Sequence, residues 1–101
     1  MGSITIVELN SIGGQGAVDG SPVANLSAVI KTTTDATTTT TAENITLDPN
    51  TRYVVITADA LHRVSVKDSA VTDRFITVSS SVQSDFAINE SDRTLYYRTD
   101  A

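Results

Sequence analysis

The amino-acid sequence predicts an all-β fold, namely a small antiparallel β-sandwich or barrel of jelly-roll-like topology with an extended N-terminal arm. Apolar residues recur at a spacing of two along most of the chain, and no segment of about ten residues shows the spacing of an amphipathic helix. Turn-forming residues separate strand-like segments about every eight to twelve residues, as in sandwiches and barrels. With 101 residues, of which 40% are hydrophobic, the chain is long enough for one small core.

The N-terminal segment is the first strand-like element. Residues 4–9 carry apolar side chains on both sides, which suits a strand laid on a neighbouring subunit. We expect residues 1–25 to form an arm with a Gly-rich connector and residues 26–101 to form a single β-domain. We expect contacts with a capsid or another subunit at five apolar residues of the arm: Ile4, Ile6, Val7, Leu9 and Ile12. A first strand of the domain's own sheet, followed by a long glycine loop, explains the same residues equally well.

The next elements are two half-buried strands and a central one. Apolar residues alternate with others over residues 26–30, and Ile45 and Leu47 flank Thr46 just before the turn signal of residues 48–50. Residues 52–58 are apolar on both faces, which predicts a central strand covered on two sides.

The remaining strands are expected around residues 64–66, 75–78, 82–88 and 95–97. The segment Asn89-Glu90-Ser91-Asp92 predicts a hairpin connection built on a type I turn, because such a turn needs no positive φ.

Composition excludes several classes of function. Seven basic against twelve acidic residues give a net charge of -5, the wrong sign for binding nucleic acid or an anionic membrane. The chain has no cysteine, so disulfides and thiolate sites are impossible. No apolar run reaches the ~18 residues that a membrane-spanning helix needs, and we expect a protein that is soluble where it is made.

The sequence shows no motif of catalysis or of cofactor binding. His62 is the only histidine. Asp59 lies near it in the sequence and serine is abundant, so the residue types of a catalytic triad are present. Their co-occurrence does not indicate a triad, and no G-x-S-x-G elbow is present. We expect His62 to be a structural residue of a loop or strand end. Residues 13–16 lack the Lys-Ser/Thr pair of a phosphate loop, and the acidic residues lack the order of a calcium loop. We therefore expect a non-enzymatic protein with no catalytic residue, no cofactor and no metal.

The segment of residues 32–41 holds eight threonines. Threonine forms strands readily and its hydroxyl tolerates water, which favours an exposed strand or loop. An O-glycosylated stalk would add proline, and an ice-binding face would repeat the Thr-x-Thr pattern on several coils.

The order of these pieces resembles a group of small virion proteins of tailed bacteriophages. In that group a core strand with the pattern T-x-[FY]-V-x-[VI]-x-[TA]-D-A leads into a hairpin, and an F-x-[VI] strand follows before the C-terminal strand. The matching residues here are Thr51, Tyr53, Val54, Asp59 and Ala60, followed by Phe86, Ala87 and Ile88. The chain departs from the group in lacking a glycine after Ala60 and a Pro-Gly turn where residues 90–92 stand.

The resemblance implies a capsid decoration, or cement, protein. Such proteins form small β-barrels or sandwiches, often trimers, that bind the major capsid protein on the outer surface of the virion after synthesis in the bacterial cytoplasm. A carbohydrate-binding or receptor-binding β-module of a phage tail or cell surface is the alternative. Such modules present exposed aromatic rings, and here alternation directs one of Tyr96 and Tyr97 inward.

Overall fold

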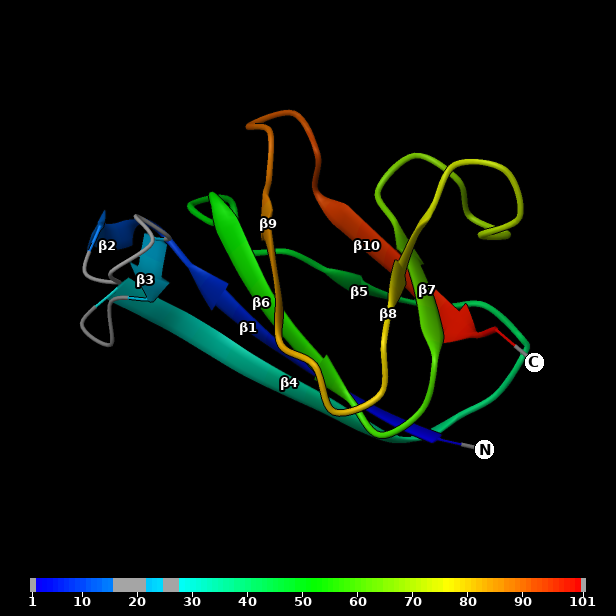
Figure 1. The fold of residues 1–101 in the computed structure, drawn as a ribbon. Coiled ribbons are helices and arrows are strands. Elements are labelled where there is room, and N and C mark those ends of the chain that lie inside the picture. Colours follow the sequence, from blue (N-terminus) through cyan, green and yellow to red (C-terminus); the bar gives the residue numbers. More distant parts are fainter. Residues whose placement is uncertain (1, 16–21, 25–27, 101) are drawn as a thin grey trace.

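A computed structural model describes residues 2–15, 22–24 and 28–100 of the chain, with residues 12–15 and 22–24 described as backbone. These residues form ten strands and no α-helix, which confirms the all-β prediction (Figure 1). The strands are β1 (Gly2–Leu9), β2 (Ile12–Gln15), β3 (Pro22–Ala24), β4 (Val29–Thr38), β5 (Glu43–Thr46), β6 (Tyr53–Ala58), β7 (His62–Ser65), β8 (Ile76–Val78), β9 (Ser84–Ala87) and β10 (Thr94–Thr99).

Two four-stranded antiparallel sheets form a sandwich. One sheet has the order β4-β1-β6-β9 and the other the order β5-β10-β7-β8, while β2 and β3 form a separate hairpin pair. A jelly roll arises when a long hairpin of eight strands, paired 1:8, 2:7, 3:6 and 4:5, wraps into two sheets. Counting from β4 and placing β1 last, the observed pairs β4:β1, β5:β10, β6:β9 and β7:β8 follow that scheme. The fold is therefore a jelly-roll sandwich whose last strand is supplied by the N-terminus.

The two ends of the described chain meet at the connection between β6 and β7, which makes this permuted order possible. The backbone N–H of Ser3 donates to the Asp59 carboxylate at 2.7 Å, and the N–H of Asp100 donates to the carbonyl of Leu61 at 2.9 Å. Figure 1 shows both ends on the same side of the sandwich.

The core lies between the sheets and is built from small aliphatic side chains because the chain has few aromatic residues. The period-two alternation places these residues inward, as on β6, where buried and less buried residues alternate. The central cluster consists of Ile4, Ile6, Leu47, Val54, Ile56, Ala58, Val64, Val78, Ile88, Leu95 and Tyr97.

The structure does not confirm the extended N-terminal arm. Strand β1 lies in the middle of its own sheet, hydrogen-bonded to β4 on one side and to β6 on the other. The first-strand alternative is therefore the correct one, since the two-sided apolar pattern belongs to a strand in the interior of the chain's own sheet. The expected domain boundary at residue 25 lies outside the described residues.

The predicted hairpin at residues 89–92 is also wrong. The turn itself forms, since the N–H of Asp92 donates to the carbonyl of Asn89 at 3.0 Å. However, β9 pairs with β6 in one sheet and β10 pairs with β5 and β7 in the other, so this turn carries the chain between the sheets. A turn signal in the sequence does not tell which sheet the next strand joins.

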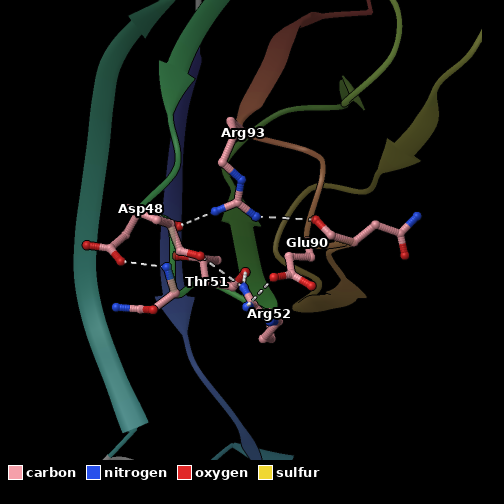
Figure 2. Close-up of polar contacts among 8 residues, drawn as sticks. Asp48, Thr51, Arg52, Glu90 and Arg93 are labelled. Atoms are coloured by element: carbon pink, nitrogen blue, oxygen red, sulfur yellow. Dashed lines mark hydrogen bonds and ion pairs between the residues drawn. The ribbon is translucent and has the colours of Figure 1, made fainter.

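Two arginines fasten this turn to the connection between β5 and β6 (Figure 2). Arg93 donates to the carbonyl of Asp48 at 2.7 Å and to that of Asn89 at 3.3 Å. Arg52 donates to the carbonyls of Pro49 and Thr51 in the connection at 3.0 and 3.1 Å, and its guanidinium lies 3.9 Å from the carboxylate of Glu90 in the turn. Both guanidinium groups therefore bind backbone oxygens at one end of the sandwich.

A buried carboxylate holds the same connection from inside. Glu8 on β1 has 0% exposure, and its Oε1 accepts hydrogen bonds from the Asp48 N–H at 2.8 Å and the Thr51 hydroxyl at 2.9 Å. Its Oε2 lies 3.7 Å from the ammonium group of Lys31. Glu8 thus connects the first strand to the turn before β6, a role that the sequence did not reveal.

Candidate functional site

The lone histidine is a structural residue at a strand end, as predicted. His62 begins β7 with 0% exposure. Its Nδ1 lies 2.7 Å from the carbonyl oxygen of Ala60, which can only accept, so Nδ1 carries a proton. Its Nε2 lies 2.7 Å from the hydroxyl of Thr38. The Nε2 contact joins the two sheets, because Thr38 belongs to β4, while the Nδ1 contact holds the connection between β6 and β7.

The five expected contact residues are not gathered on one surface. Ile4 and Ile6 belong to the central core, and Leu9 is 1% exposed, so these three are not free for another subunit. Val7 lies on the outer side of β1 and is half-buried. The side chain of Ile12 lies outside the described residues.

The outer side of the β4-β1-β6-β9 sheet carries two rows of uncharged residues on β4, β1 and β6, and the exposed Asp85 of β9 stands beside Val55 at the end of one row. The pairing of the three strands β4, β1 and β6 places one row of threonines and one row centred on valine side by side. We name these six residues the threonine–valine face: Thr34, Thr5 and Thr57 in one row, and Thr32, Val7 and Val55 in the other. The hydroxyls of Thr5 and Thr34 lie 3.2 Å apart, as expected for cross-strand neighbours.

The threonine-rich segment therefore has the predicted place in an exposed strand. Most of β4 is exposed or half-buried, and β4 pairs only with β1 among the described strands. The prediction that β6 is central is confirmed, but its expected two-sided cover is not, since Val55 on the outer side is only half-buried.

The outer side of the other sheet is different because the chain covers it. The loop of residues 66–75 lies over β7 and β10, and Arg98 of β10 donates to the carbonyls of Ala70 and Val71 at 3.3 and 3.2 Å. Arg63 of β7 stacks on the ring of Phe75 at 4.3 Å from its centroid and donates to the Asp100 carboxylate. We name this surface, formed by Arg63, Arg98 and the loop, the arginine face.

Asp68 gives the covering loop its shape. Its carboxylate accepts hydrogen bonds from four backbone N–H groups of the loop, those of Ala70, Thr72, Asp73 and Arg74. These bonds, with that from Asp73 the strongest influence, hold the pKa of Asp68 well below its usual value. The charged carboxylate is thus the centre around which the loop folds.

Of the two neighbouring tyrosines, Tyr97 is the one that points inward. Its hydroxyl donates to the Asp35 carboxylate at 2.9 Å, and burial, with the nearby carboxylate, raises the pKa of the phenol. Tyr96 is half-buried, which leaves one partly exposed ring on that strand.

An apolar cleft of about 240 Å³ opens at the side of the sandwich where both sheets end, at β8 and β9. Its lining combines core residues with residues of the covering loop: Val54, Val64, Ser65, Val66, Lys67, Arg74, Phe75, Ile76, Phe86, Ala87, Ile88 and Leu95. The lining is mostly aliphatic and aromatic, and its two charged members, Lys67 and Arg74, are cations.

Comparison with known proteins gave no relatives, since no protein family, no curated protein and no solved structure matches the chain. Within the described residues no helix is long and apolar enough to cross a membrane, and no group of three histidine, aspartate or glutamate residues is placed to hold a metal ion. The candidate sites among the described side chains are the threonine–valine face and the apolar cleft.

Proposed function

We propose that the chain is a non-enzymatic structural protein that binds other protein subunits, and that it decorates and stabilises the capsid of a tailed bacteriophage as a homotrimer bound to the major capsid protein. The observation that carries the proposal is the threonine–valine face. Its six residues are uncharged on a chain in which 19% of residues are charged, and its two valines, Val7 and Val55, are paired neighbours. The charged residue beside this face is Asp85 of β9, which is paired with Val55 at the sheet's edge strand.

Charge explains why such a face suits assembly. A chain with a net charge of -5 binds another protein most readily through a surface that carries few of its charges. Threonine and valine give a flat contact that is partly apolar and tolerates water before assembly. Three copies joined into one body would bind a shell with high effective concentration, even where each single contact is weak.

The sequence resemblance supports the same assignment. The core strand that carries it, with Tyr53 and Val54, is β6, and β6 also supplies Val55 and Thr57 to the threonine–valine face. Val55 and Thr57 stand at unspecified positions of the pattern, so the resemblance supports the assignment of the strand and not the choice of the contact surface.

Co-sedimentation tests the proposal. The shell protein is chosen from the genes beside the one that encodes the chain, and the purified chain is mixed with empty shells assembled from it. We expect the wild-type chain to sediment with the shells and Val55→Lys to remain largely in the supernatant. Thr46→Lys is the matched control, because Thr46 is an exposed strand residue of the other sheet, and it is expected to bind like the wild type.

A glycan array separates the alternative function. Binding of the chain to defined glycans, with no sedimentation on shells, would overturn the capsid assignment in favour of a carbohydrate-binding module.

A further inference from the structure

The apolar cleft between β8 and β9 is a part of the core that the chain leaves unfilled. The register pairs Ile76 with Val64, so Ile76 points to the core side of its sheet, yet it is 57% exposed. Phe86, paired with Val54, points to the core side of the other sheet and is only half-buried. Core-side residues of a closed sandwich are buried, so the exposure of these two marks a gap that an apolar group can fill.

Both strands beside the cleft have a free edge. Within the described chain β8 pairs only with β7, and β9 pairs only with β6. A free edge presents unpaired N–H and C=O groups, to which an extended segment of another protein can add as a further strand.

The charge at the cleft is opposite to the charge of the whole chain. Lys67 and Arg74 are its charged lining residues, whereas the chain carries -5. The Lys67 ammonium lies 2.9 Å from the buried carboxylate of Asp92 and is thereby engaged. Arg74 forms no ion pair within the described residues, so its guanidinium is available to a carboxylate.

The size of the cleft indicates an anchoring side chain. Pockets for small molecules usually measure about 300–1,000 Å³. The cleft, at about 240 Å³ and open on one side, is smaller and suits one large or two small apolar side chains.

We propose that this cleft binds an extended segment of another protein that adds as a strand to the free edge of β9, inserts an aromatic or large aliphatic side chain between Ile76 and Phe86, and places a carboxylate beside Arg74. This site is separate from the threonine–valine face and does not depend on the capsid assignment. It adds a second kind of contact, directed to a peptide with alternating apolar and acidic residues.

The test is a titration of the full chain with two short peptides followed by NMR. In the first peptide phenylalanine and valine alternate with glutamate and threonine, and in the second lysine replaces glutamate. We expect the acidic peptide to shift the backbone amide signals of β8 and β9 and to bind about tenfold more tightly than the basic one, as an added charge-assisted contact implies. Equal affinities, no shift with the acidic peptide at millimolar concentration, or shifts confined to β1, β4 and β6 would each overturn the proposal.

Variants of the cleft sharpen this test. Arg74→Glu is expected to weaken binding of the acidic peptide about tenfold and to favour the basic one. Ile76→Trp, at a core-side lining position that is 57% exposed, is expected to fill the cleft and abolish binding. The double variant Thr40→Asp with Thr41→Asp changes the net charge by the same amount as Arg74→Glu at exposed positions outside the cleft, and unchanged binding is expected there.

Discussion

The outer sides of the two sheets differ in what covers them. The loop of residues 66–75 closes over the arginine face, where Arg98 binds two loop carbonyls and Arg63 stacks on Phe75. No described segment makes such contacts with the threonine–valine face, where Val7 and Val55 stay half-buried. The chain therefore covers one outer side of its sandwich with its own loop, and the other side is the one that we propose for contact with a second molecule.

The difference between the two sides bears on how a strand with apolar residues on both faces is interpreted. Strands β1 and β6 carry apolar residues on both faces, which normally indicates cover on both sides. The core covers the inner residues of β6, such as Val54 and Ile56, at 0% exposure, whereas Val55 between them has no such cover. The apolar residues on the outer side that the chain leaves uncovered, Val7 and Val55, lie on the surface that we assign to assembly.

The largest loss of stability is expected when the contacts between the arginine face and its covering loop are removed. Arg98→Ala removes the donors to the carbonyls of Ala70, Val71 and Thr99. We expect the free energy of unfolding to fall by about 3 kcal/mol, since hydrogen bonds from a charged group contribute about 1.5–3 kcal/mol each and part of that is recovered by water. Urea unfolding followed by circular dichroism measures the change. A loss no larger than that of Thr46→Ala would contradict the role of the loop as a structural cover.

The second effect is a pH dependence of stability that arises from Asp68 on the arginine face. The folded-state pKa of Asp68 lies below its unfolded value, so its contribution to stability is complete above about pH 4 and is lost as the pH falls through the folded-state pKa. We expect Asp68→Asn to be less stable at neutral pH and to lose less stability than the wild type on acidification below pH 4. Parallel curves of stability against pH for the two proteins would show that the four N–H bonds contribute nothing.

A smaller effect is expected on the uncovered face. Val55→Lys places a charge on a surface that the single chain does not cover, and the free energy of unfolding should change by less than about 1 kcal/mol. Thermal unfolding of a dilute sample provides the measurement. A loss of several kcal/mol would mean that Val55 is part of the core after all.

The smallest effect concerns two residues with positive φ, Val71 at 56° in the covering loop and Ser81 at 63° in the exposed connection between β8 and β9. Ser81→Gly should stabilise the fold by about 0.5 kcal/mol, because glycine adopts this conformation without strain. Val71→Gly should instead destabilise it, because Val71 is fully buried and its packing outweighs the relief of strain. Differential scanning calorimetry compares the two, and stabilisation by both would show that burial under the loop counts for little.

Much of the fold could be predicted from the sequence, because period-two alternation is a local signal. It identified the central strand around Val54 and Ile56. It failed for the N-terminal strand, since Ile4 and Ile6 show the same pattern whether they cover their own core or a neighbour. The turn residues at 89–92 predicted a turn, but they did not tell that the next strand, β10, lies in the other sheet.

The candidate sites depend on pairing between distant segments and were largely invisible to local signals. Thr5 meets Thr34 and Thr57 only after β1 enters between β4 and β6. Glu8 gave no sign of burial, because its partners Asp48 and Thr51 lie forty or more residues away. Among the predicted contact residues, Val7 is the one whose side chain the structure places on an outer face. The signal for it was an apolar residue on the side of the strand opposite to Ile4 and Ile6.

The most direct test of the assembly surface uses the absence of cysteine from the chain. Val55→Cys on the threonine–valine face and Thr46→Cys on the other sheet are each labelled with a maleimide, first as free chain and then bound to assembled shells. We predict that binding slows the labelling of Cys at position 55 by about tenfold or more, since a covered thiol reacts only through transient opening, while labelling at position 46 is unchanged. Labelling at position 55 that proceeds equally fast in the bound and free chain would contradict the account.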